Sequence, residues 1–337
     1  PVTAVKALAS LLTIDYLTVS STALTSDQYS SDVASKLTTS SLTITAVSAA
    51  RAQDLVSDSK VSAVTVLDTS EGVLDSSSNI TTALANLTNN TKLGSASITL
   101  TDPTANLSYS ATDWSSYATA FSKISNLSTA TVTVTDVGAS ALASVAAMST
   151  VDKITVSSTT LTDTQYTSTA ATKVTTTGLT VTDVLATRAQ SLFTADSKVS
   201  AVTVLDSANY IYDALTDLNA NTKLSSITLS DASPVLSLTS SEWTSNATAL
   251  GKISNLSSTD VTVTAVAAAD VSTLSAVSTI DHIALADGVR SLTDTQYTST
   301  AATKVTTTDL TITDVLATRA QSLFTADSKV SAVTVLD

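Results

Sequence analysis

Residues 179–206, LTVTDVLATRAQSLFTADSKVSAVTVLD, decide the fold because they contain one complete strand–helix–strand unit. Near each end two aliphatic residues flank a Thr, as in Val202-Thr203-Val204. This period-two alternation, with β-branched residues on both phases, is typical of a strand with aliphatic side chains facing a core and Thr facing outward. Between the strands, Leu185, Ala189 and Leu192 have helical spacing. We therefore expect strand, helix and strand in that order.

The unit recurs along the chain. Residues 161–206 and 292–337 match at 44 of 46 positions, and a diverged copy covers residues 24–68. Self-similarity at a fixed period predicts a repeat architecture, in which each repeat is stabilised by its neighbours. We expect a single array over residues 1–337 with repeat units at about 24–160, 161–291 and 292–337, the last one truncated.

The aliphatic–Thr–aliphatic triplet occurs thirteen times, with Ala284 as the one variant centre. Successive strands joined through helices pair in parallel, with right-handed crossovers. The sequence thus predicts an α/β fold: a right-handed α/β solenoid of about 13 strand–helix coils, with one parallel sheet and helices on one of its faces. The other face should carry a column of Thr, which we take as the contact face: Thr43, Thr65, Thr99, Thr133, Thr155, Thr180, Thr203, Thr228, Thr262, Thr311 and Thr334.

Asp and Lys frame the strands. Asp often follows two residues after a triplet, and Lys with an aliphatic residue precedes most strands, as in Lys198-Val199. Asp at a helix start and Lys in its last turn would both complement the helix dipole. Aligned carboxylates could instead bind Ca²⁺, which prefers oxygen ligands. We favour helix capping and no cofactor, with calcium as the alternative at Asp102, Asp136, Asp183, Asp206, Asp231 and Asp314.

Composition disfavours several function classes. The net charge of −13 disfavours nucleic-acid binding, which depends on Lys and Arg neutralising phosphates. The chain has no Cys and one His, His282, so thiolate chemistry and Ser-His-Asp catalysis are not expected. No apolar run approaches the roughly 20 residues of a membrane span. We expect no enzyme and no membrane insertion, and we interpret Trp114 and Trp243 as interior aromatics rather than sugar-stacking ones.

The text Val-Thr-Val-Thr-Asp at 132–136, with Ala/Ser/Thr-rich helices ending in Ser-Lys-Val or Ser-Lys-Ile, resembles the strand-repeat arrays of very large bacterial surface proteins. These arrays occur in surface-layer proteins and in giant adhesins exported by type I secretion. The resemblance covers the whole chain and implies export, repetition, and self-assembly or adhesion. It assigns no residue a chemical role.

Together these observations predict a structural protein of the extracellular space or cell surface. Its partner would be itself, as a homo-oligomer, surface layer, filament or matrix. The alternative is an adhesin or ligand-binding module whose Thr face binds a glycan or ice, and a polysaccharide is the further candidate partner.

Overall fold

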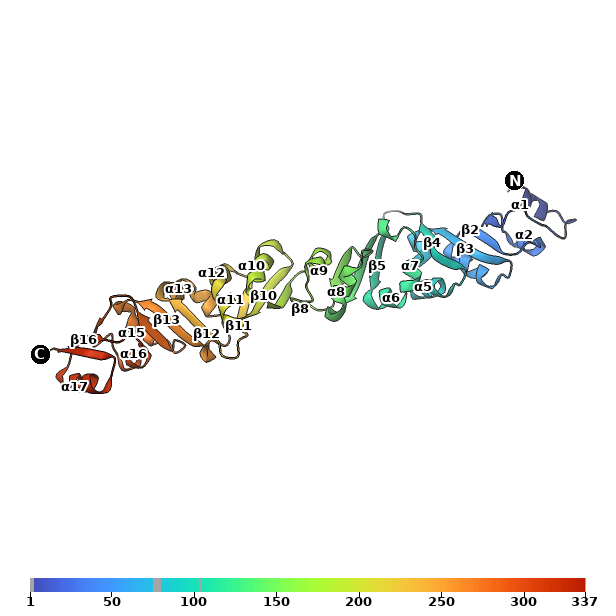
Figure 1. Ribbon diagram of the computed structural model, residues 1–337. Helices are drawn as coiled ribbons and strands as arrows, with labels where there is room; N and C mark the ends of the chain where they lie inside the picture. Colours follow the sequence, from blue (N-terminus) through green and yellow to red (C-terminus); the bar gives the residue numbers. More distant parts are fainter. Residues whose placement is uncertain (1–2, 75–79, 103–104, 337) are drawn as a thin grey trace. The chain divides into compact units, whose positions relative to one another are not determined.

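The computed structural model describes residues 3–74, 80–102 and 105–336, and it shows an α/β protein with several parallel sheets (Figure 1). The chain forms two compact units. The first unit comprises Pro1–Ser158 and Thr167–Thr176, and the second comprises Thr159–Tyr166 and Thr177–Asp337. The single array over residues 1–337 stays a prediction.

The first unit contains two sheets whose strands pair in chain order and in parallel. The four-stranded sheet consists of β1 (Ala23–Thr25), β2 (Leu42–Val47), β3 (Val61–Asp68) and β4 (Leu93–Leu100). The three-stranded sheet consists of β5 (Asn106–Ser110), β6 (Thr131–Val137) and β7 (Lys153–Val156). The helices of the first unit are α1 (Thr3–Ala9), α2 (Ser31–Lys36), α3 (Ala49–Asp54), η1 (Leu55–Ser57), α4 (Ser70–Leu74), α5 (Ile80–Asn89), α6 (Ala111–Ser116), α7 (Ala118–Ser122), η2 (Leu127–Thr129), α8 (Ala139–Ala147) and α9 (Ser168–Lys173).

The second unit contains three sheets built in the same way. Their strands are β8 (Thr160–Thr162), β9 (Leu179–Val184), β10 (Val199–Asp206) and β11 (Leu224–Leu229), then β12 (Val235–Thr239), β13 (Asp260–Val266) and β14 (His282–Leu285), then β15 (Ser291–Thr293), β16 (Leu310–Val315) and β17 (Val330–Val335). The helices are α10 (Ala186–Ala195), α11 (Ala208–Asp213), α12 (Leu215–Ala220), α13 (Ser240–Ser245), α14 (Ala247–Leu250), η3 (Leu256–Ser258), η4 (Ala268–Asp270), α15 (Val271–Ser275), α16 (Ser299–Lys304) and α17 (Ala317–Ala326).

The expectation of one sheet with about 13 strands was wrong, because the described residues form seventeen strands in five sheets. The physical reason is that the extended segments turn corners. The segment that begins with β11 continues, after a turn at residues 230–234, as β12. β11 pairs with β10, whereas β12 pairs with β13. One stretch of extended chain therefore contributes to two different sheets.

Side chains continue the pairing where a sheet ends. At the edge of its sheet, β11 has one further parallel bridge, between its own Ile227 and Ile253, which lies outside the named strands. Next to that bridge, the Asn255 amide accepts the Leu229 N–H at 3.0 Å and donates to the Leu229 carbonyl at 2.9 Å. Asn126 does the same for Leu100, at 3.0 and 2.9 Å. In both units an Asn side chain thus replaces the backbone of a missing strand.

Several strands contain a bulge with left-handed backbone. Asp136, Asp183 and Asp314 lie at φ of +54°, +57° and +60°, and Ala46 and Ala265 occupy the corresponding places at +54° and +53°. The pairing register shifts at each of these sites. An extra residue on one strand is the defining property of a bulge, and it bends that strand.

The core is formed by the aliphatic residues that flank the Thr positions. In β9, Leu179, Val181 and Val184 are fully buried. Ala189 and Leu192 of α10 are buried as expected, but Leu185 precedes the helix and is 53% exposed. Of the helices in the described residues, none is long and apolar enough to cross a membrane.

Candidate functional site

The predicted contact face lies where the alternation places it. The Thr side chains of this face are half-buried between their neighbours, except Thr99 and Thr334, which are exposed, as is Thr18 of the first triplet. The flanking aliphatic side chains point into the core, as in β6, where Val132 and Val134 are fully buried. The structure thus places the whole predicted set outside the core.

The register mixes other small residues into this face. Thr180 lies between Thr160 and Ala201, and Thr43 lies opposite Ala63. The expected unbroken column of Thr is therefore wrong, because the bulges shift neighbouring triplets past each other. Two charged or titratable positions also enter the face, since Lys153 lies opposite Thr133 and His282 lies opposite Thr262.

The calcium candidates divide into two groups with different contacts. Asp206 and Asp231 accept the first N–H of helices α10 and α11, from Ala186 at 3.0 Å and Ala208 at 2.6 Å. Asp102 accepts the Ser70 N–H at 2.8 Å, at the start of α4. In each case the helix precedes the strand that ends at the Asp, so the expectation that Asp caps the following helix was wrong.

The second group, Asp136, Asp183 and Asp314, occupies the left-handed bulges and is exposed. Asp tolerates this conformation better than most residues, because its short polar side chain bonds locally. Among residues 3–74, 80–102 and 105–336, no group of three or more His, Asp or Glu is arranged to hold a metal ion. Calcium binding stays a prediction, and the observed roles of these carboxylates are capping and bulge formation.

Some lysines bind carbonyls at the end of a helix that lies further back in the chain than the helix directly before them. Lys123 is buried, and its Nζ donates to the carbonyls of Leu87 at 2.7 Å and Asn90 at 3.0 Å, at the end of α5. Lys223 likewise donates to the carbonyl of Leu192 in the last turn of α10 at 3.3 Å and to that of Asp196 just after the helix at 2.7 Å. These Lys side chains satisfy carbonyls at the end of an earlier helix. The expectation of Lys in the last turn of a helix is confirmed for Lys36, Lys173 and Lys304, whereas Lys123 and Lys223 follow their helices and bind earlier ones.

The two Trp residues and His282 differ in how deeply they are buried. Trp114 is buried and stacks on Phe121, with ring centroids 4.3 Å apart. This confirms its interpretation as an interior aromatic. Trp243 is only half-buried and borders a shallow hollow. His282 is exposed at the start of β14, with Nε2 3.5 Å from the Asp260 carboxylate.

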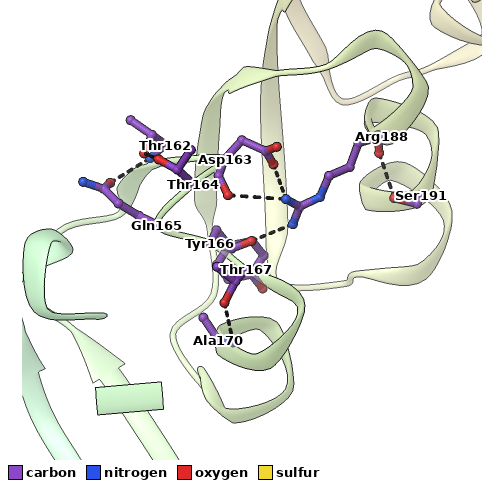
Figure 2. Close-up of polar contacts among 9 residues, drawn as sticks. All are labelled: Thr162, Asp163, Thr164, Gln165, Tyr166, Thr167, Ala170, Arg188 and Ser191. Atoms are coloured by element: carbon purple, nitrogen blue, oxygen red, sulfur yellow. Dashed lines mark hydrogen bonds and ion pairs between the residues drawn. The ribbon is translucent and has the colours of Figure 1, made fainter. Parts of the chain in front are cut away.

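One polar cluster, which we call the tyrosine node, was not predicted (Figure 2). Tyr166 is fully buried and donates its hydroxyl to Asp196 at 2.6 Å. Arg188 of α10 contacts the Asp163 carboxylate at 2.5 Å and donates to the Tyr166 carbonyl at 2.6 Å. Gln165 folds back and accepts the Thr162 N–H at 2.8 Å. The node therefore ties the β8 turn to α10 and to the start of β10.

Burial governs the ionisation of this node. It raises the pKa of Tyr166, and the hydrogen bond to Asp196 raises it further. Burial also disfavours the Asp196 carboxylate, but hydrogen bonds from Tyr166 and from the Lys198 N–H outweigh it and hold the pKa of Asp196 below its ordinary value. The pKa of Asp163 is raised by burial in spite of Arg188. The protonated tyrosine and the ionised Asp196 stabilise each other.

Tyr166, Ala170 and Val174 have helical spacing, and their interpretation as the apolar stripe of a helix concealed the node. Tyr166 instead lies just before α9, which begins at Ser168. The available signal was the recurrence of Tyr, Arg and Asp at equal spacing in residues 161–206 and 292–337. No family model, curated protein or solved structure significantly matches this chain.

Proposed function

We propose that this protein is a structural repeat protein of the extracellular space or cell surface that builds a layer, filament or matrix by self-association. The observation that carries the proposal is the recurrence, in both units, of the same small, mostly uncharged outward residues. Surfaces that repeat along a chain suit repeated contacts with identical molecules.

The proposal includes a finer account of the fold. Each unit would be a segment of a right-handed α/β solenoid, with helices on one side of the sheets. In support, the strands and isolated bridges of the described residues fall into thirteen groups separated by α-helices, and each group contains one of the thirteen triplets. Pairing in chain order through helical connections also favours this topology, and right-handed crossovers are the strong rule for such connections.

Hydroxyl pairing favours packing against another protein surface over binding to a glycan or ice. Thr99 and Ser125 share a hydrogen bond of 2.9 Å, and so do Thr228 and Ser254. Thr135 and Thr264 donate to strand carbonyls at 3.2 and 3.3 Å. At these four Thr positions the hydroxyl is already bonded within the protein, which leaves the methyl group to meet a partner.

The test replaces Thr133, Thr155, Thr180 and Thr203 with Lys and measures assembly by sedimentation and electron microscopy. Their side chains lie outside the core, so we expect a folded monomer that no longer associates. A matched control adds the same charge on exposed helix positions Ser122, Ser144, Ser191 and Thr216, and it should still assemble. An unmodified protein that stays monomeric, or equal assembly of both variants, would contradict the proposal.

A further inference from the structure

The tyrosine node occurs three times, and one copy lacks a carboxylate. In the third copy Tyr297 donates to Asp327 at 2.6 Å and Arg319 contacts Asp294 at 2.5 Å, as in the second. In the first copy Tyr29 donates to Asp58 at 2.6 Å, and Arg51 donates to the Tyr29 carbonyl. The position of Asp163 and Asp294 is taken there by Ser26.

This substitution leaves Arg51 without its acidic neighbour. Among the described residues no Asp or Glu forms an ion pair with Arg51, although Asp163 and Asp294 do so for its counterparts. In the sister nodes the Asp contacts Nη1 of its Arg. Arg51 lacks that contact, and its Nε is in addition buried without a hydrogen-bond partner. Asp27 is next in sequence but exposed, and it makes no ion pair with Arg51. A buried donor without a partner is costly.

The first node also has one more formal positive charge than the second. The second node holds Arg188 and Lys198 against Asp163 and Asp196, so its formal charges cancel. The first node holds Arg51 and Lys60 against Asp58 alone, which leaves one positive charge, two cations minus one anion. Lys60 binds the Ala34 carbonyl rather than a carboxylate. One added anion would restore neutrality.

We propose that Arg51 and Ser26 form a binding position for a carboxylate supplied from outside the node. A guanidinium group binds a carboxylate by donating two parallel N–H···O hydrogen bonds to it. The side chain of Ser is shorter than that of Asp, which leaves the carboxylate position of the sister nodes to an incoming group. Its source is a small carboxylate anion or an acidic side chain of a second copy of the chain, and the latter source rests on the proposed self-association.

The first arm of the test is a formate titration of dilute protein at constant ionic strength, with chloride as the balancing anion and thermal unfolding as the readout. The midpoint temperature of the parent should rise with formate and saturate. Ser26→Asp supplies the carboxylate internally, so it should raise the midpoint without formate and abolish the response. Asp163→Ser should lower the midpoint and create a new formate response at the second node.

Two further variants serve as controls. Arg51→Gln removes the fork and should remove the response even if Ser26→Asp fails to fold. Asp27→Asn should keep it, which excludes that exposed carboxylate as the true partner. The second arm measures sedimentation of the parent and Ser26→Asp at high protein concentration.

A formate response identifies a small carboxylate as the ligand. Absence of the response together with lost association in Ser26→Asp identifies an acidic side chain of a second copy. Neither effect, or an equal formate response in Arg51→Gln, overturns the proposal. A parent that never associates refutes the proposed function but leaves the formate arm decisive for this site.

Discussion

Ala265 should be a strained residue whose replacement by Gly stabilises the protein. It lies in the bulge of β13 at φ +53°, where the Cβ of an L-residue crowds the following carbonyl oxygen. That conformation costs roughly 1–2 kcal/mol for a residue with a Cβ. Gly removes the crowding but gains about 0.4–1 kcal/mol of unfolded-chain freedom. With the middle of each range, 1.5 minus 0.7, the net expected gain in the free energy of unfolding is about 0.8 kcal/mol.

The matched control is Ala201→Gly in β10 of the same unit. Ala201 pairs with Thr180 beside a register shift in β10, but it is not among the residues with positive φ. There Gly should cost about 0.5–1 kcal/mol. The same chemical change is thus expected to act with opposite sign at the two positions, a separation of about 1–2 kcal/mol from the sum of the two estimates.

Urea unfolding followed by tryptophan fluorescence measures both effects, in a Trp114→Phe background that leaves Trp243 as the reporter of the second unit. The midpoints should move apart at unchanged slope, since the slope scales with exposed surface. Ala265→Asp, which copies the Asp136 of the sister bulge at φ +54°, should also stabilise. A fall in stability for Ala265→Gly equal to that for Ala201→Gly would refute the assigned backbone.

Three other predictions concern the node, the Asn pairing and the repeat. Because the pKa of Tyr166 is raised in the folded state, the stabilisation by this residue should be present below the unfolded-state pKa of about 10 and lost as pH rises through the folded-state pKa, by about 1.4 kcal/mol per pH unit. Urea unfolding at a series of alkaline pH values should show that the free energy of unfolding falls less steeply with pH in Tyr166→Phe. An equal fall in the parent and the variant would contradict this. Asn255→Asp keeps the acceptor but sets a carboxylate against the Leu229 carbonyl, so we expect a loss of about 1–3 kcal/mol in urea unfolding, against little change for Asn209→Ala on an exposed helix position. Deleting residues 161–291 joins Thr160 to Leu292 and preserves the local repeat text, so circular dichroism should show a shorter folded protein; loss of folding would argue against a modular array.

Local features of this chain could be predicted from the sequence, whereas neighbour-dependent ones could not. The alternation at Leu179, Thr180 and Val181 predicted a half-buried strand, because side-chain direction in a regular strand depends on local geometry alone. The division into five sheets depends on corners such as residues 230–234, which no periodicity marks. Asp206 and Lys223 could be matched to helix ends by type, but the helix each would bind depends on which segments pack together.

Gly178 and Asp309, which occupy equivalent positions in two near-identical segments, are a further feature that the sequence alone does not explain. They are one of the two differences between residues 161–206 and 292–337, and the sequence gives no reason for the exchange. In the structure Gly178 lies at φ +74° and Asp309 at φ +60°, just before β9 and β16. Gly and Asp are both tolerated in left-handed backbone, so the exchange is conformationally conservative.

The capping contacts also impose an order on folding. The first N–H of α3, at Ala49, is bound by Asp68, 19 residues later in the chain, and the Leu192 carbonyl in α10 is bound by Lys223, 31 residues later. A helix in a chain that emerges N-terminus first therefore lacks its terminal partners until the next strand has appeared. At a synthesis rate of roughly 5–20 residues per second, that delay is on the order of 1–6 seconds per helix. The nascent protein should consequently fold in chain order, with the most recently formed helix lacking its terminal partners until the next strand has emerged.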